Sequence, residues 1–115
     1  GRRDPSAKLR AREQGLGARR SRVPLAPFVH SDNQSSGRYT ILDITARNAV
    51  GLLHRISRTI SQHACDVDLV LISTEGERAI DVFHITQRGD KLSAYAEAAL
   101  TGDLTRMLED YDEAD

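Results

Sequence analysis

The sequence predicts an α+β fold in which a four-stranded antiparallel sheet carries two helices on one face. Two observations support this prediction. Some segments are rich in β-branched residues and alternate apolar with polar side chains, whereas two others repeat apolar residues at helical spacing. The segments follow the order strand, strand, helix, strand, strand, helix. Such an order buries its apolar surfaces when both helices pack on the same side of the sheet.

Two strands are predicted before the first helix. Residues 23–33 contain Pro24 and Pro27, which favour an extended edge segment, and residues 32–37 supply turn-forming side chains. Residues 39–46 alternate in the manner of a half-buried strand. One face of that strand carries Leu42, Ile44 and Ala46, and the other carries Tyr39, Ile41, Asp43 and Thr45.

The second half of the chain predicts a hairpin flanked by helices. Residues 66–73 and 79–86 are the hairpin strands, joined by a glycine-bearing connection at 74–77. The first helix starts at Gly51 and has its apolar stripe at Leu52, Leu53, Ile56, Ile60 and Ala64. The second helix runs over residues 95–111, and the run 101–103 is predicted to interrupt it, with Asp103 capping the second piece.

Taken together, these elements predict a ferredoxin-like plan in a permuted form, ββαββα. The usual last strand of that plan is missing after the second helix. Residues 28–33 are expected to take its place at the front of the chain.

Charge divides the 115 residues into a basic arm and one small acidic domain. Residues 1–22 hold eight of the 16 Lys and Arg residues but only two of the 17 acidic residues, and they lack apolar periodicity. We therefore predict a basic flexible linker at 1–22 and a folded domain at 23–115. The acidic balance of the folded part argues against a nucleic acid partner.

The cysteine count and the hydropathy pattern indicate a cytoplasmic protein. Cys65 is the single cysteine, so no internal disulfide can form, and it is expected to be a small packing residue. No apolar run approaches membrane-spanning length, and the start lacks the hydrophobic stretch of a signal peptide. No membrane partner is predicted, and the chain is expected to be a piece of a longer protein.

The most site-like feature is the junction between the second strand and the first helix. A helix that opens on a glycine turn presents backbone N–H groups and a partial positive charge to a small polar ligand. The predicted ligand-binding residues are Asn48, Ala49, Val50, Gly51, Leu52 and Leu53. The alternative is purely structural: Gly51 permits the turn and Asn48 caps the helix.

Other polar residues give weaker indications. His63 and Cys65 lie close in sequence, but no further ligands stand at a suitable spacing, so no metal and no cofactor are predicted. Asp43 and Asp81 lie on strands, where single charges on an open sheet face are commonly solvated or paired with an Arg. We predict no catalytic residue from them.

The pattern around this junction resembles that of ACT regulatory domains. A strand ends in a short turn, Gly-Leu-Leu follows, and then come an amphipathic helix and a hairpin. The segments RYTILDITARNAVGLL (38–53), ISTEGERAIDVFHIT (72–86) and the upstream SDNQSS are most similar to the C-terminal ACT domain of bacterial protein-PII uridylyltransferase/uridylyl-removing enzymes. The resemblance covers about 23–109, and its most specific piece is Gly76-Glu77-Arg78 leading into Asp81-Val82-Phe83.

This resemblance implies a sensor rather than a catalyst. Such enzymes end in two ACT domains, the second permuted in this way and preceded by an arginine-rich linker. Glutamine bound at the ACT region shifts them from uridylylating the PII protein towards removing the uridylyl group. Where the family usually has Asp-Arg-Pro-Gly, this chain has Asn48-Ala49-Val50-Gly51, so only Gly51 carries over. The chain contains neither catalytic motif of the enzyme and is expected to be its regulatory part, with an amino acid ligand, glutamine favoured.

Two other functions remain open at this stage. A four-stranded sheet with helices on one side leaves its other face and two edges uncovered, which favours an interaction module that pairs with another ACT domain or with its own copy. Ile41, Val70 and Val82 are the candidate residues of that surface. Catalysis in the style of an acylphosphatase is a third possibility, with Arg47-Asn48 as the residues that suggest it.

Overall fold

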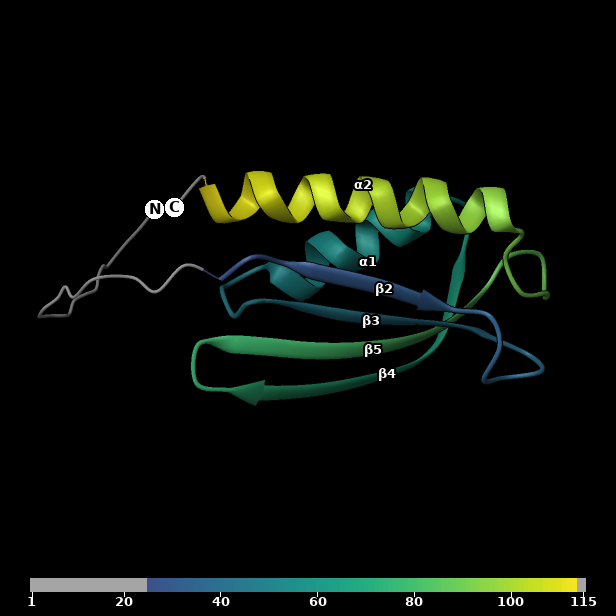
Figure 1. The fold of residues 1–115 in the computed structure, drawn as a ribbon, viewed down its shortest axis with the longest axis horizontal. Helices are drawn as coiled ribbons and strands as arrows, with labels where there is room; N and C mark the ends of the chain where they lie inside the picture. The colour runs from purple at the N-terminus through teal and green to yellow at the C-terminus, as the bar shows by residue number, and fades with distance from the viewer. Residues whose placement is uncertain (1–24, 114–115) are drawn as a thin grey trace, which may run out of the picture.

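The computed structural model describes residues 25–113, and it confirms the predicted order of elements (Figure 1). The predicted linker at 1–22 lies outside the described residues. The elements are β2 (Phe28–Asp32), β3 (Thr40–Arg47), α1 (Leu52–Gln62), β4 (Asp66–Glu75), β5 (Arg78–Thr86) and α2 (Ala94–Glu113). No helix within the described part of the chain is long and apolar enough to cross a membrane.

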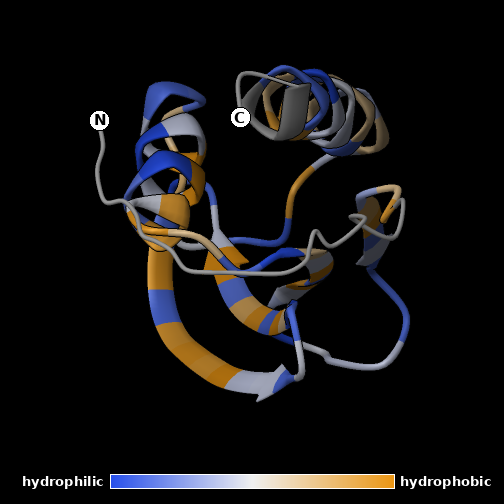
Figure 2. Ribbon diagram, turned by 90° about the vertical axis from the view of Figure 1, so that its left-hand side faces the viewer, coloured by the Kyte–Doolittle hydropathy of each residue, from blue (hydrophilic) through white to orange (hydrophobic). Residues whose placement is uncertain are grey.

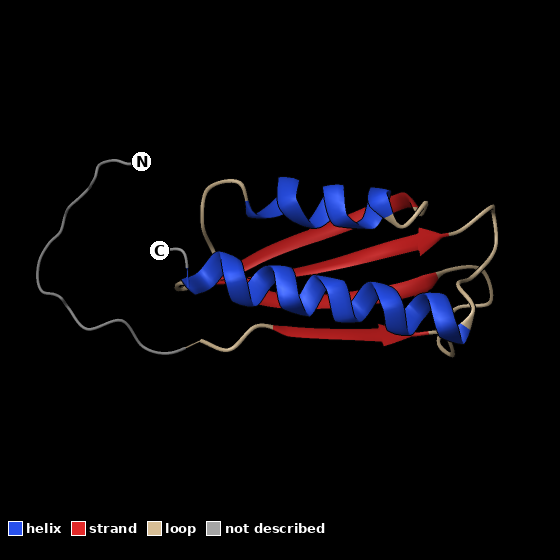
Figure 3. Ribbon diagram, turned by 90° about the horizontal axis from the view of Figure 1, so that it is seen from above, coloured by secondary structure: helices blue, strands red, loops and turns tan. Residues whose placement is uncertain are grey.

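The four strands form one antiparallel sheet in the order β2-β3-β5-β4, so β2 and β4 are its edges. Both helices lie side by side over the same face of this sheet, as seen from the end in Figure 2 and from above in Figure 3. This is the predicted ferredoxin-like arrangement, with β2 at the front of the chain as an edge strand beside β3.

Alternation in the two central strands builds the core. Leu42 and Ile44 on β3 and Phe83 and Ile85 on β5 lie on the helix-covered side of the sheet, and all four side chains are fully buried. The intervening residues of β3 are only half-buried on the other face, as predicted. The helices complete the core with the apolar residues Leu52, Ile56, Ile60, Leu100, Leu104 and Leu108.

The second helix is continuous, and the predicted break at 101–103 is wrong. Gly102 stays helical within α2, at a cost of roughly 1 kcal/mol relative to alanine. Leu100, Leu104 and Leu108 recur on one face and are fully buried, so their burial outweighs that cost. Asp103 is not a helix cap: its carboxylate bonds His63 Nε2 at 2.7 Å and pairs with Arg106.

A β-bulge in β4 changes which side chains face the helices. The strand register shifts between Val67 and Leu69, so one extra residue enters the strand there. Val70 consequently pairs with Phe83 and packs against the core, and its predicted place on the open face is wrong. Leu69 and Leu71 take that face instead, exposed by 45% and 54%.

The loop between β2 and β3 is tied to the start of α2 by a partly buried hydrogen-bond network. The Thr40 hydroxyl donates to Asn33 Oδ1 at 2.6 Å and accepts the Leu92 backbone N–H at 2.9 Å. Asn33 Nδ2 donates to the Leu92 carbonyl, and Lys91 Nζ donates to the Asn33 carbonyl. These bonds fix one end of the helix layer against the sheet edge.

Candidate functional site

The predicted turn lies where β3 ends and α1 begins, and it is held by the β4–β5 hairpin. The Asn48 backbone N–H donates to the Glu77 carbonyl at 2.7 Å. The Arg47 guanidinium, largely buried, bonds the Glu77 carboxylate at 2.6 Å. These contacts attach the turn to the hairpin, whose Gly76-Glu77-Arg78 run is the most specific piece of the family resemblance.

Gly51 is the N-cap of α1 and has a φ of 85°, in the left-handed region that favours glycine. No side chain caps the helix, so the alternative role of Asn48 as a cap is not what the structure shows. The first-turn N–H groups of an α-helix have no partner within the helix. The N-terminus of α1 therefore offers backbone donors and a positive dipole end at this turn.

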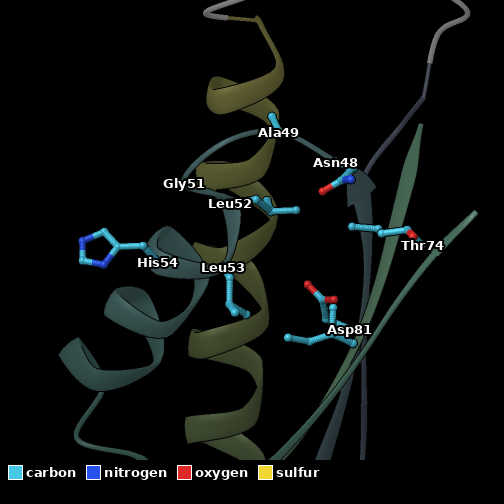
Figure 4. Close-up of a pocket in the computed structure, with 10 residues that line it drawn as sticks. Asn48, Ala49, Gly51, Leu52, Leu53, His54, Thr74 and Asp81 are labelled. Carbon is cyan, nitrogen blue, oxygen red and sulfur yellow. The ribbon is translucent and has the colours of Figure 1, made fainter. Parts of the chain in front are cut away.

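A cavity of about 310 Å³ opens beside the turn (Figure 4). Its size is at the lower end of the range for small-molecule sites. Five of the six predicted ligand residues line it; Val50 does not and is 98% exposed. The lining residues are Asn48, Ala49, Gly51, Leu52, Leu53, His54, Ile72, Thr74, Ala79 and Asp81.

Asp81 is the cavity residue that sequence reasoning placed wrongly. It does not lie on the open sheet face but on the helix-covered face of β5, where it is only 2% exposed. Its neighbours across the strands are Ile44 and Ile72. Within the described residues, its Oδ1 is the buried side-chain atom that has no hydrogen-bond partner. Burial in these surroundings raises the pKa of the Asp81 carboxyl.

The alternation of residues in β5 already indicates that Asp81 lies on the buried face of the strand. Asp81 has the same parity as Ala79, Phe83 and Ile85 in the alternating run AIDVFHIT, and those three apolar residues form the buried face of β5. A charged residue on the apolar face of a central strand is the informative exception. Asp43, by contrast, lies half-buried on the open face of β3, as predicted.

The remaining candidate residues have structural roles. Cys65 is buried in the core, and burial, followed by the charge of Asp66, raises the pKa of its thiol. His63 bonds Asp103 and links α1 to α2. Among residues 25–113 no group of three or more potential metal ligands comes together.

Chemically, the cavity combines two opposite electrostatic features. The N-terminus of α1 favours a negative group, whereas the buried carboxylate of Asp81 favours a positive one. His54 is the other titratable side chain in the lining, and in Figure 4 its ring points away from Asp81. The arrangement suits the binding of a small dipolar molecule.

Comparison with known proteins supports the family resemblance. The chain is 36% identical over 84 residues to the bifunctional uridylyltransferase/uridylyl-removing enzyme of Novosphingobium aromaticivorans, covering 72% of this chain and 9% of that enzyme. The enzyme of the same name from Caulobacter vibrioides is 34% identical over 87 residues, covering 74% of this chain and 9% of the enzyme. That from Rhodopseudomonas palustris is 30% identical over 113 residues, covering 96% of this chain and 12% of the enzyme.

The chain is homologous to a segment of bifunctional uridylyltransferase/uridylyl-removing enzymes. The resemblance stated from the sequence is thereby confirmed, and the homology is consistent with an ACT-like domain of such an enzyme. No family model matches the chain. Because the chain spans only about a tenth of the length of these relatives, it is not a complete enzyme of this kind.

Proposed function

We propose that this chain is an amino-acid-sensing regulatory domain and that glutamine is its ligand. On this proposal it controls a cytoplasmic uridylyltransferase/uridylyl-removing enzyme that acts on a PII protein in nitrogen regulation. The homology supports the proposal that the chain is a regulatory part of such an enzyme. The proposal assigns no catalytic residue to this chain.

The observation that carries this proposal is the cavity at the strand-to-helix turn. It forms at the residues for which the sequence predicts ligand binding, and Gly51 provides the left-handed backbone that the turn requires. Ala49 and Val50 replace the Arg and Pro of the usual family turn, so recognition falls to Asn48, to backbone N–H groups and to the strands. Figure 4 shows Asn48 and Asp81 directed into the same space.

The cavity also borders a sheet edge that is suited to pairing. Ile72 and Thr74 belong to β4, which is an edge strand of ten residues. Hydrophobic bands follow one another along this strand (Figure 2), and its exposed apolar residues are Val67, Leu69, Leu71 and Ile72. An exposed edge strand has unpaired backbone N–H and C=O groups that can pair with a strand of another domain. We propose that a second ACT domain, or a second copy of this chain, pairs there and covers the open side of the cavity.

A thermal-shift panel tests the proposed ligand. The full chain is heated with each of the twenty amino acids at millimolar concentration, and glutamine is expected to raise Tm selectively. A ligand that binds only the folded form stabilises it by RT ln(1 + [L]/Kd), about 2.7 kcal/mol at a hundredfold excess over Kd. A selective shift with another amino acid would contradict the glutamine assignment. An unchanged Tm with all twenty would contradict amino acid sensing.

The exposed β4 edge favours a second candidate function, an interaction module without its own ligand. Gly51→Val distinguishes the two, since a β-branched residue is strained at a φ of 85° and would distort the turn. If the chain is a sensor, this variant loses the glutamine response but keeps its oligomeric state. Leu71→Lys on β4 is expected to lower the oligomeric mass in ultracentrifugation. Tyr95→Lys on α2, at a site 85% exposed and away from β4, serves as its control.

A further inference from the structure

The feature that the sensor proposal leaves unexplained is the unsatisfied carboxylate of Asp81. Buried side-chain oxygens in folded proteins nearly always have a hydrogen-bond partner, and an orphan one calls for an explanation. Asp81 Oδ1 has none, although the side chain is 98% buried. Its neighbours across the sheet are the apolar side chains of Ile44 and Ile72, which offer no donor.

The side chain is nevertheless not enclosed on all sides. It lines the cavity at the turn, and Figure 4 shows its carboxyl oxygens directed into that space, between Leu53 on α1 and Thr74 on β4. A donor that enters the cavity therefore approaches the Asp81 carboxyl group. The orphan carboxyl of Asp81 and the N-terminal turn of α1, which no side chain caps, are independent features, and both line the same cavity.

We propose that Asp81 is the specificity-determining residue of this site, and that it binds the α-ammonium group of a free amino acid. The α-carboxylate of the same ligand then lies at the first-turn N–H groups of α1, at Leu53 and His54. This inference rests on the proposed function, because it assigns the recognition chemistry of the same cavity. It selects zwitterionic amino acids and rejects the corresponding acids that lack the ammonium group.

An ammonium group fits this position better than other donors do. An amide group of a ligand would donate the missing hydrogen bond to Asp81. It would nevertheless leave the negative charge of the carboxylate buried without a counter-charge. A metal ion would need further ligands, and Asp81 is the one acidic side chain that lines the cavity. The ring of His54 points away, so the chain does not supply the cation itself in this conformation (Figure 4).

The opposite end of the cavity completes the recognition. Glycine at the N-cap removes any side chain from the mouth of the helix, and a Cβ placed on Gly51 would meet nothing within 4 Å. A carboxylate gains two kinds of stabilisation at such a terminus, direct N–H hydrogen bonds and the helix dipole. Charge complementarity at both ends fixes the orientation of the ligand in the cavity.

Isothermal titration calorimetry of the full chain tests the inference with three compounds and two variants. The compounds are glutamine, glutamate and glutaramate, the analogue of glutamine that lacks the α-ammonium group. Asp81→Asn keeps the shape of the side chain and removes its charge. Asp43→Asn makes the same chemical change on the open face of the sheet and serves as the matched control.

We expect glutamine to bind the unmodified chain and the Asp43→Asn variant with the same Kd. Asp81→Asn should weaken glutamine binding by about thirtyfold or more, as loss of one member of a buried charge pair does. Glutaramate should bind the unmodified chain equally weakly. Glutamate keeps the ammonium group, so Asp81→Asn should weaken any glutamate binding by a similar factor.

Failure of this inference is distinguishable from failure of the proposed function. If glutamine binds Asp81→Asn as tightly as the unmodified chain, or if glutaramate binds as well as glutamine, the role of Asp81 is refuted while amino acid sensing stands. If no amino acid binds the unmodified chain, both proposals fail.

Discussion

Removing the charge of Asp81 is expected to stabilise the ligand-free domain at neutral pH. The carboxylate lies 2% exposed on the apolar face of β5, and its Oδ1 has no hydrogen-bond partner. An unsatisfied buried polar group costs about 1–3 kcal/mol, and more when it is charged. The amide of Asp81→Asn is cheaper to bury than a carboxylate. We therefore expect this variant to be about 1–3 kcal/mol more stable. For a domain of this size, each kcal/mol corresponds to roughly 4–8 °C in Tm.

The pH dependence of this difference identifies its cause. Burial raises the pKa of Asp81 in the folded state above its ordinary value of 3.8. Between these two pKa values the folded state binds more protons than the unfolded state, so this group lowers stability as the pH rises. Below 3.8 the carboxyl is protonated in both states, and the advantage of Asp81→Asn should vanish.

Urea unfolding of both proteins over a pH series measures this effect. Comparing the two proteins at each pH cancels the contributions of all other titrating groups. Asp43→Asn, the same chemical change on the half-buried open face of β3, provides the control. The reasoning is refuted if Asp81→Asn is less stable at neutral pH, or if its advantage is the same at every pH.

Three further predictions concern the framework of the site. Thr40→Val removes the hydroxyl that accepts the buried Leu92 N–H, so urea unfolding should show a loss of about 1–3 kcal/mol. Gly51→Ala meets no steric contact but must adopt a φ of 85°, so it should cost about 1–2 kcal/mol in the same assay. Hydrogen bonds from His63 and then from Arg106 lower the pKa of Asp103. The stability that Asp103 contributes should therefore be present above pH 3.8 and lost as the pH falls through its lowered pKa. The Asp103→Asn variant should lack this pH-dependent loss in the same urea unfolding assay.

Most of the fold could be predicted because hydrophobic periodicity is strong in its central elements. Leu42, Ile44, Phe83 and Ile85 alternate with polar or smaller residues, and this pattern fixes the buried face of both central strands. The edge strand was less predictable. The bulge after Val67 inserts a residue without any sequence signal such as glycine, and every side chain beyond it changes face.

The continuity of α2 shows tertiary packing overriding local propensity. The Thr101-Gly102-Asp103 run is a reasonable helix stop when only its local sequence is considered. Three fully buried leucines spaced by four residues hold the helix together across it. Local propensity is worth a few tenths to about 1 kcal/mol per residue, whereas each buried leucine contributes roughly 1.5–3 kcal/mol.

The sequence predicted the residues that the turn contributes to the cavity, but it did not predict those that the strands contribute. Glycine chemistry marked the turn, and five of its six predicted residues line the cavity. Ile72, Thr74 and Asp81 come from the hairpin, and their approach to the turn depends on how the sheet pairs, which the sequence does not state directly. Asp81 was the one residue among them that strand parity alone could have revealed.

The most direct test of the account is an NMR titration of the isotopically labelled chain with glutamine. We predict saturable shifts concentrated at the backbone amides of Leu53 and His54, with a second group around Asp81 on β5. Shifts centred instead on the open sheet face, at Ile41 and Val82, would contradict the assignment of the site. An unchanged spectrum at millimolar glutamine would contradict the claim that this domain senses glutamine.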